Sequence, residues 1–208
     1  MFHKSMVAAW CGLGASALVL VGAAPAALGL EDTPSRVVLR DAPADVWRVD
    51  VRTSEWTLVG DLPAADVRVA RINHRVRAVT IRTRFADLRR AGVQRHWAGI
   101  ATPDDDFFVE VTTRPRRPDG RHVLYDGAAG EKVACAGLSH RVDYATDRVT
   151  ARVPRQCLGD PKWVKVNAGN ILVTRGTPTR RHYADNPHNR EPYSNTGTRR
   201  IHRVDLES

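Results

Sequence analysis

A period of two in the alternation of apolar and polar residues is the feature that most constrains how this chain folds. In the stretch VRAVTIRTRF, the side chains of Val79, Ile81 and Phe85 fall on one side of an extended chain, and those of Arg82 and Arg84 fall on the other. Successive side chains of a β-strand point to opposite faces, so this pattern predicts a half-buried antiparallel strand. Similar alternation recurs at 36–41, 45–51, 66–76, 107–126, 141–153 and 162–169.

Turn signals separate these strands and define the expected fold. Pro118-Asp119-Gly120 combines a fixed φ with a residue that tolerates positive φ, which predicts a hairpin turn. A second turn is expected at Ala145-Thr146-Asp147, and a change of side-chain parity predicts a bulge near Arg71. Helical signals are limited to one turn around 85–90, which Gly92 would end. The sequence thus predicts an all-β protein, an antiparallel, jelly-roll-like β-sandwich with little helix.

The two ends of the chain differ from the strand-rich middle. Residues 1–29 carry one lysine, no acid and an apolar run that ends in small residues, a composition typical of a signal peptide. A retained membrane anchor and a lipoprotein linked through Cys11 are the alternatives. We expect a β-sandwich domain at 31–173 and a polar, basic, irregular C-terminal arm at 174–208, with one edge strand near 200–206. The mature protein would then be secreted, extracellular or in the cell envelope, with no membrane span.

The predicted export determines how the cysteines are interpreted. The chain has three, and removal of the leader leaves Cys135 and Cys157. An even pair in an oxidising compartment predicts a disulfide, which would join the outer ends of the hairpin around Thr146. A zinc site would need further Cys or His ligands at short spacing, and a Cys–His nucleophile would need His140. Both alternatives stay open on the sequence alone.

The chain is strongly basic. It carries a formal net charge of +9 with a pI near 10.2, and only four of its 32 basic residues are lysines. Such a charge favours anionic partners, although the codon usage of a GC-rich genome also enriches arginine. Because an exported protein rarely meets nucleic acid, we expect glycans or anionic cell-wall polymer as partners and no nucleic acid.

The motifs FADL, VDY, TD, VPR, CLG and WV, which begin at Phe85 and end at Val164, resemble a widespread group of exported β-domain proteins from high-GC, actinobacterial-type bacteria. The resemblance covers residues 41–175 by pattern. The order of an Asp-rich start, paired strands and a late turn before a final strand is also similar to carbohydrate-binding sandwiches of the family-9 and DOMON type. These resemblances imply a secreted β-sandwich and no particular activity.

Tryptophans supply the candidate ligand-binding residues. Trp163 shares a strand face with Lys165, opposite two valines, so its ring is expected on the outside of the sheet, where a sugar could stack on it. Trp56, in a turn-like stretch, and Trp97, in a loop, are further candidates. The alternative is that these large rings fill the ends of the core.

Acidic residues supply the candidate metal ligands. Asp104, Asp105 and Asp106 could offer oxygen ligands to Ca²⁺, but they lack EF-hand spacing, and a solvated turn is the alternative. No G-x-S-x-G, P-loop, H-E-x-x-H or G-x-G-x-x-G motif occurs, so we expect no enzyme and no organic cofactor. We predict a non-enzymatic binding or adhesion module for glycans or cell-wall polymer. The alternatives are an envelope structural protein that docks on anionic polymer through its basic arm, and a metal-dependent enzyme.

Overall fold

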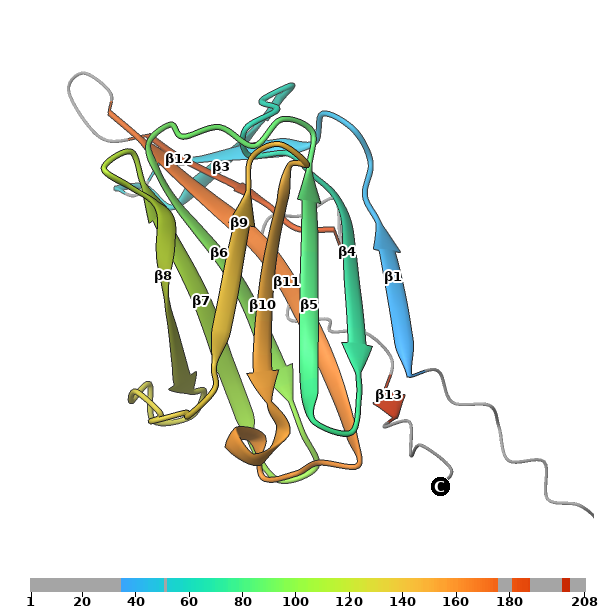
Figure 1. The fold of residues 1–208 in the computed structure, drawn as a ribbon. Helices are drawn as coiled ribbons and strands as arrows, with labels where there is room; N and C mark the ends of the chain where they lie inside the picture. Colours follow the sequence, from blue (N-terminus) through green and yellow to red (C-terminus); the bar gives the residue numbers. More distant parts are fainter. Residues whose placement is uncertain (1–34, 51, 176–180, 188–199, 203–208) are drawn as a thin grey trace, which may run out of the picture. The chain divides into compact units, whose positions relative to one another are not determined.

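The computed structural model describes residues 35–50, 52–175, 181–187 and 200–202 (Figure 1). The predicted signal peptide, 1–29, lies outside these residues. In the described part, the elements are β1 (Arg36–Arg40), β2 (Val46–Asp50), β3 (Glu55–Gly60), β4 (Val67–His74), β5 (Ala78–Phe85), β6 (Val93–Ala101), β7 (Asp106–Arg114), β8 (Arg117–Asp126), β9 (Ser139–Asp143), β10 (Arg148–Pro154), the 3-10 helix η1 (Arg155–Leu158), β11 (Trp163–Thr174), β12 (Arg181–Asp185) and β13 (Ile201–His202).

The strands form two antiparallel sheets, which confirms the predicted all-β sandwich. The small sheet has the order β1-β4-β5-β10-β9, and the large sheet has the order β3-β2-β12-β11-β6-β7-β8, with β13 paired to β11. Figure 1 shows the small sheet in the foreground and the large sheet behind it. Among the described residues there is no helix with the length and hydrophobicity needed to cross a bilayer.

The core lies between the two sheets and is built by the period-two alternation. Ile81 and Phe85 of β5 are buried in one apolar cluster with Val164 and Val166 of β11. Fully burying one such side chain stabilises the fold by about 1.5–3 kcal/mol, so the alternating positions determine which face of each strand turns inward. Val109 of β7 belongs to the same cluster, as its strand pattern predicts.

The predicted turn at Pro118-Asp119-Gly120 was misplaced. The turn of the β7–β8 hairpin is Pro115-Arg116, because Arg114 pairs with Arg117. Pro118 to Gly120 instead form an irregularity inside β8, where Gly120 has φ +82° and an added Cβ would lie 3.2 Å from the Thr112 carbonyl oxygen. The prediction of a positive φ at Gly120 is confirmed, whereas the prediction that the strand begins only after this residue is wrong.

The irregularity in β8 connects the edges of the two sheets. The hydroxyl of Tyr144 donates a hydrogen bond to the Pro118 carbonyl oxygen at 3.0 Å, and Nε2 of His140 lies 2.7 Å from the Asp119 carbonyl oxygen. His140 belongs to β9, the edge strand of the small sheet, whereas Pro118 and Asp119 belong to β8, the edge strand of the large sheet. The displaced carbonyl groups therefore serve as acceptors for side chains of the opposite sheet.

Two further local predictions need correction. The bulge in β4 lies between Val67 and Val69 and not near Arg71, since Val67 pairs with Phe85 and Val69 already pairs with Arg84. Residues 86–90, where one helical turn was expected, contain no helix. The predicted turn at 145–147 is present and joins β9 to β10.

The C-terminal arm contains a strand that the sequence did not reveal. Within the predicted irregular segment 174–208, β12 lies between β11 and β2 and pairs with both. The hairpin of β2 and β3 joins the large sheet through β12. The predicted edge strand near 200–206 is present as β13, in which Ile201 is fully buried, while Val204 and Leu206 lie outside the described residues.

The predicted disulfide is confirmed. Cys135 and Cys157 are bonded, with their Cα atoms 5.5 Å apart, and the bond links the segment before β9 to η1 after β10. Closing a loop of this size stabilises a fold by about 3 kcal/mol in the chain-entropy model. Because both sulfur atoms are bonded, neither is available as a thiolate nucleophile or zinc ligand in this state.

Candidate functional site

The outward face of the small sheet is covered by arginine. Over the length that its five strands share, each strand presents three outward positions, and eight of these fifteen positions hold exposed arginines. The alternation that turns Ile81 and Val149 inward turns their arginine neighbours outward. We call these eight residues the arginine face: Arg36, Arg40, Arg71, Arg82, Arg84, Arg141, Arg148 and Arg152.

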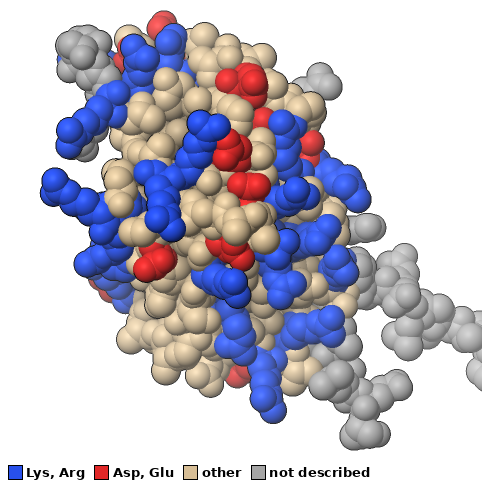
Figure 2. All heavy atoms as spheres, turned by 45° about the horizontal axis from the view of Figure 1, so that its top comes forward, with Lys and Arg blue, Asp and Glu red and all other residues tan. Residues whose placement is uncertain are grey.

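The arginine face is poorly compensated by acidic groups. Its one acidic outward position, Asp143, accepts a hydrogen bond from Nη2 of Arg141 at 3.1 Å. Among the described residues, the other seven arginines of the face form no ion pair. Figure 2 shows basic side chains spread over the visible surface, with fewer acidic ones between them.

Like charges face each other within the arginine face. Arg71 of β4 lies directly opposite Arg82 of β5, and Arg84 of β5 lies directly opposite Arg148 of β10. Like charges at directly opposed positions of a sheet are destabilising by some tenths of a kcal/mol to about 1 kcal/mol per pair. Bound anionic groups would relieve this repulsion.

The outward face of the large sheet contains a groove of about 450 Å³. This volume lies within the range of roughly 300–1,000 Å³ that is common for small-molecule sites. The groove crosses β2, β3, β12, β11 and β6, and it is lined by Val49, Ser54, Trp56, Arg95, Ile171, Val173, His182 and Ala184.

Trp56 and Arg95 contribute an aromatic ring and a charged group to the lining of the groove. Trp56 lies in β3, opposite Val49 of β2, and not in a turn as the sequence suggested. The guanidinium of Arg95 is held by Glu110, whose Oε2 accepts bonds from Nε at 2.8 Å and from Nη2 at 2.6 Å. The groove thus combines an aromatic ring with a positively charged group of fixed orientation.

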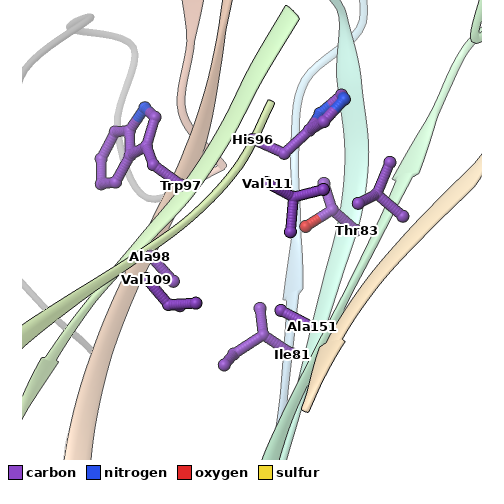
Figure 3. Close-up of a pocket in the computed structure, with 9 residues that line it drawn as sticks. Ile81, Thr83, His96, Trp97, Ala98, Val109, Val111 and Ala151 are labelled. Atoms are coloured by element: carbon purple, nitrogen blue, oxygen red, sulfur yellow. The ribbon is translucent and has the colours of Figure 1, made fainter. Parts of the chain in front are cut away.

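Trp97 lies near the middle of β6, which corrects its assignment to a loop. Figure 3 shows its indole on the opposite side of β6 from His96, away from the core. Its ring lies against Gly169, where an added Cβ would come within 2.6 Å of Cζ2, and it stacks on Phe108 at 5.9 Å between centroids. Phe108 in turn lies 6.5 Å from the ring of Tyr125. These rings form a half-buried aromatic band outside the groove.

Trp163 and Lys165 lie on the outward side of β11, as predicted from the buried valines between and beside them. The guanidinium of Arg200 sits 4.6 Å above the ring of Trp163 and covers one of its faces. Trp163 is six positions along β11 from Gly169, about 20 Å in an extended strand. Of the four predicted ligand-binding residues, all lie on the outward face of the large sheet, but only Trp56 lines the groove.

The three consecutive aspartates lie in the exposed connection between β6 and β7. Thr102 organises this turn, because its hydroxyl donates to the Asp105 carbonyl oxygen at 2.8 Å and accepts from the amide of Asp105 at 2.9 Å. The carboxylates of Asp104, Asp105 and Asp106 do not converge within 4.8 Å of one another. They form a solvated turn.

Carboxylates do converge elsewhere, at Asp41, Asp45 and Asp185. Sequence reasoning missed this group because Asp185 lies in the segment that was expected to be irregular. The part of this group that was visible in the sequence is the pair Asp41 and Asp45, which flank a short Ala-Pro-Ala stretch between β1 and β2.

A small internal cavity of about 20 Å³ lies between the sheets (Figure 3). It is lined by Thr83 and by His96, whose ring contacts Phe85 edge-on at 5.1 Å between centroids. Burial, and then the nearby His140, lower the pKa of His96 to about 3, so this histidine is neutral at physiological pH. A cavity of this size holds at most one water molecule, which excludes it as a site for a larger ligand.

No protein-family model, curated protein or solved structure matches this chain. The function must therefore be argued from the residues themselves.

Proposed function

We propose that this protein is a non-enzymatic binding module that holds an anionic polysaccharide on its arginine face. The observation that carries the proposal is the presence of eight arginines among fifteen outward positions, with one acidic residue. The planar guanidinium group binds carboxylate, sulfate and phosphate groups through paired hydrogen bonds. The anionic partner is the one expected from the net charge. Its proposed binding site is the small sheet and not the C-terminal arm.

The dimensions of the arginine face favour a polymer over a small anion. Five strands at about 4.8 Å spacing and five residues at about 3.3 Å give a surface of roughly 19 by 13 Å. A chain with repeated anionic groups can contact several of these guanidinium groups at once. Such simultaneous contacts raise the affinity far above that of a single charge pair, which contributes about 0–1 kcal/mol at an exposed site.

The composition of the same face argues against single-stranded nucleic acid. Proteins that bind single strands place aromatic side chains where the bases can stack on them. The fifteen outward positions hold no aromatic residue; besides the arginines they carry Val38, Val69, Asn73, Thr80, Ser139, Asp143 and Thr150. An acidic polysaccharide requires no such stacking surface.

The experiment compares two ligands and two charge-matched variants. Polygalacturonate and its fully methyl-esterified form share one backbone and differ in charge. The variant Arg82→Ser with Arg84→Ser removes two charges from the arginine face. The control, Arg114→Ser with Arg116→Ser, removes two exposed charges at the turn between β7 and β8.

We expect calorimetric binding of polygalacturonate to weaken by at least about tenfold in the first variant, which corresponds to about 1.4 kcal/mol, and by less than about threefold in the control. The esterified polymer should not bind. Equal loss in both variants would mean that net charge alone attracts the polymer. Binding of the neutral polymer that is lost in Trp56→Ala and retained in Trp163→Ala would instead assign the ligand to the groove of the large sheet.

A further inference from the structure

Three aspartates from both sheets meet at one end of the sandwich. Asp41 follows β1 of the small sheet, Asp45 precedes β2 of the large sheet, and Asp185 is the last residue of β12. One carboxylate oxygen of each lies within 4.8 Å of those of the other two. Asp185 is 2% exposed, and Asp66, immediately before β4, is fully buried nearby.

The connection between β1 and β2 brings the first two aspartates together. Ala44 has φ +59°, and its amide donates a hydrogen bond to Oδ2 of Asp66 at 3.0 Å. The amide of Ala42 donates to Oδ1 of Asp41 at 2.9 Å. The Oδ2 atom of Asp41 is buried and has no hydrogen-bond partner among the described residues.

The negative charges of this group are weakly compensated. Burial, followed by the charges of Asp185 and Asp45, raises the pKa of Asp41 to about 9. Burial, with the charges of Asp45 and Asp66, also raises the pKa of Asp185 to about 7, although the backbone amides of Val67 and Asn186, which donate to its carboxylate, act in the opposite direction. Among the described residues, Arg68 forms an ion pair with Asp66 at 3.1 Å, and neither Asp41 nor Asp185 forms one.

An independent observation comes from Asn170 on the neighbouring strand. Asn170 is fully buried, and neither its carboxamide oxygen nor its nitrogen has a hydrogen-bond partner in the part of the chain that the structure describes. In the β11–β12 register it lies directly opposite Asp185, so the two side chains point to the same face with Cβ atoms about 5 Å apart. A buried polar group without a partner destabilises the folded state, and a bound ligand that contacts it removes this cost. Within the described residues, the buried Oδ1 of Asp66 also lacks a hydrogen-bond partner.

We propose that Asp41, Asp45, Asp185 and Asn170 bind a divalent cation with the chemistry of Ca²⁺, which joins β1 of the small sheet to β2 and β12 of the large sheet. Carboxylate and carboxamide oxygens are the donors that calcium takes, in irregular arrangements of six to eight ligands. Magnesium demands a stricter octahedron, and zinc prefers nitrogen and sulfur donors, which this group lacks. The site is separate from the arginine face and does not depend on the proposed function.

The test is the thermal unfolding of the full chain, treated with a chelator and then titrated with CaCl₂ alone. Ligand binding to the folded state raises the midpoint, and at a calcium concentration one hundred times the dissociation constant we expect a rise of about 5–10 °C. Calorimetry should detect one saturable equivalent of calcium per chain.

The variant Asp41→Asn separates a ligand from a merely structural residue. Because asparagine keeps the shape of the carboxyl group but offers the ion no negative oxygen, we expect the variant to bind calcium at least about tenfold more weakly and, without calcium, to unfold near the midpoint of the calcium-free wild type. Asn170→Leu replaces the buried amide with an apolar side chain of similar size, and it should weaken calcium binding in the same way while the calcium-free protein remains folded. Asp104→Asn, in the exposed turn, is the control and should leave the calcium response unchanged.

The absence of any saturable calcium binding or midpoint shift in the wild type would overturn the proposal. An unchanged calcium response in both Asp41→Asn and Asn170→Leu would do so as well. Loss of the response in Asp104→Asn would place the ion at the exposed turn instead.

Discussion

At the scale of single residues, this sandwich carries several polar side chains on the inner faces of its sheets. His96, Gln94 and Thr83 are all buried between the sheets. The Nε2 of Gln94 donates to the Arg89 carbonyl oxygen at 2.8 Å, whereas its Oε1 and both ring nitrogens of His96 lack hydrogen-bond partners among the described residues. His96 could not be distinguished from surface histidines on the sequence alone, because its burial depends on which face of β6 turns inward.

His96 should make the stability of the protein depend on pH. Its folded-state pKa of about 3 lies below the ordinary value of 6.5, so the unfolded chain binds a proton at this site more readily than the folded one. The contribution of neutral His96 is fully present above pH 6.5 and is lost as the pH falls toward 3. Each pH unit in this window corresponds to about 1.4 kcal/mol.

The variant His96→Leu checks this dependence. Between pH 7 and pH 5, the unfolding free energy of the wild type should fall by about 2 kcal/mol relative to that of the variant, as measured from urea denaturation. Contributions of Asp41 and Asp185, which act in the opposite direction, are common to both proteins and cancel in the difference. Parallel stability profiles would show that His96 is not the group responsible.

At the scale of elements, local alternation predicted most strands but not β3, β6 or β12. Strands such as β5 and β10 show regular apolar and polar positions, and both were predicted with the correct faces. The segment of β12, RHYAD, is short and polar, and it becomes a central strand only because β11 and β2 supply partners on both sides. Such non-local pairing cannot be deduced from five residues, which is also why Asp185 was missed as a candidate ligand.

Truncation tests the role of β12. A chain that ends at Arg175 lacks β12 and β13, which removes the link between β11 and the β2–β3 hairpin and takes Ile201 out of the core. We expect its thermal midpoint to fall by more than about 10 °C, or its cooperative transition to disappear. A chain that ends at His202 is the control and should unfold like the full protein. An unchanged midpoint in the chain that ends at Arg175 would show that the residues after 175 do not stabilise the sandwich.

At the scale of the whole molecule, composition indicated an anionic partner but could not locate its binding surface. The sequence shows how many arginines the chain has. Which of them are neighbours depends on the register of the five strands, which places Arg71 opposite Arg82 and Arg84 opposite Arg148. The disulfide could be predicted because only one cysteine pair lies outside the predicted leader, and its pairing needed no knowledge of the fold. Export and the polysaccharide partner remain predictions, to be tested by experiment.

The salt dependence of polygalacturonate binding tests the central claim most directly. Binding through several exposed guanidinium groups releases counterions and is screened by salt, so the dissociation constant should rise at least about tenfold between roughly 50 and 200 mM NaCl. The rise should be clearly smaller in Arg82→Ser with Arg84→Ser, because fewer charge contacts remain. A dissociation constant that does not change with salt, or one that changes equally in both proteins, would contradict the assignment of the polymer to the arginine face.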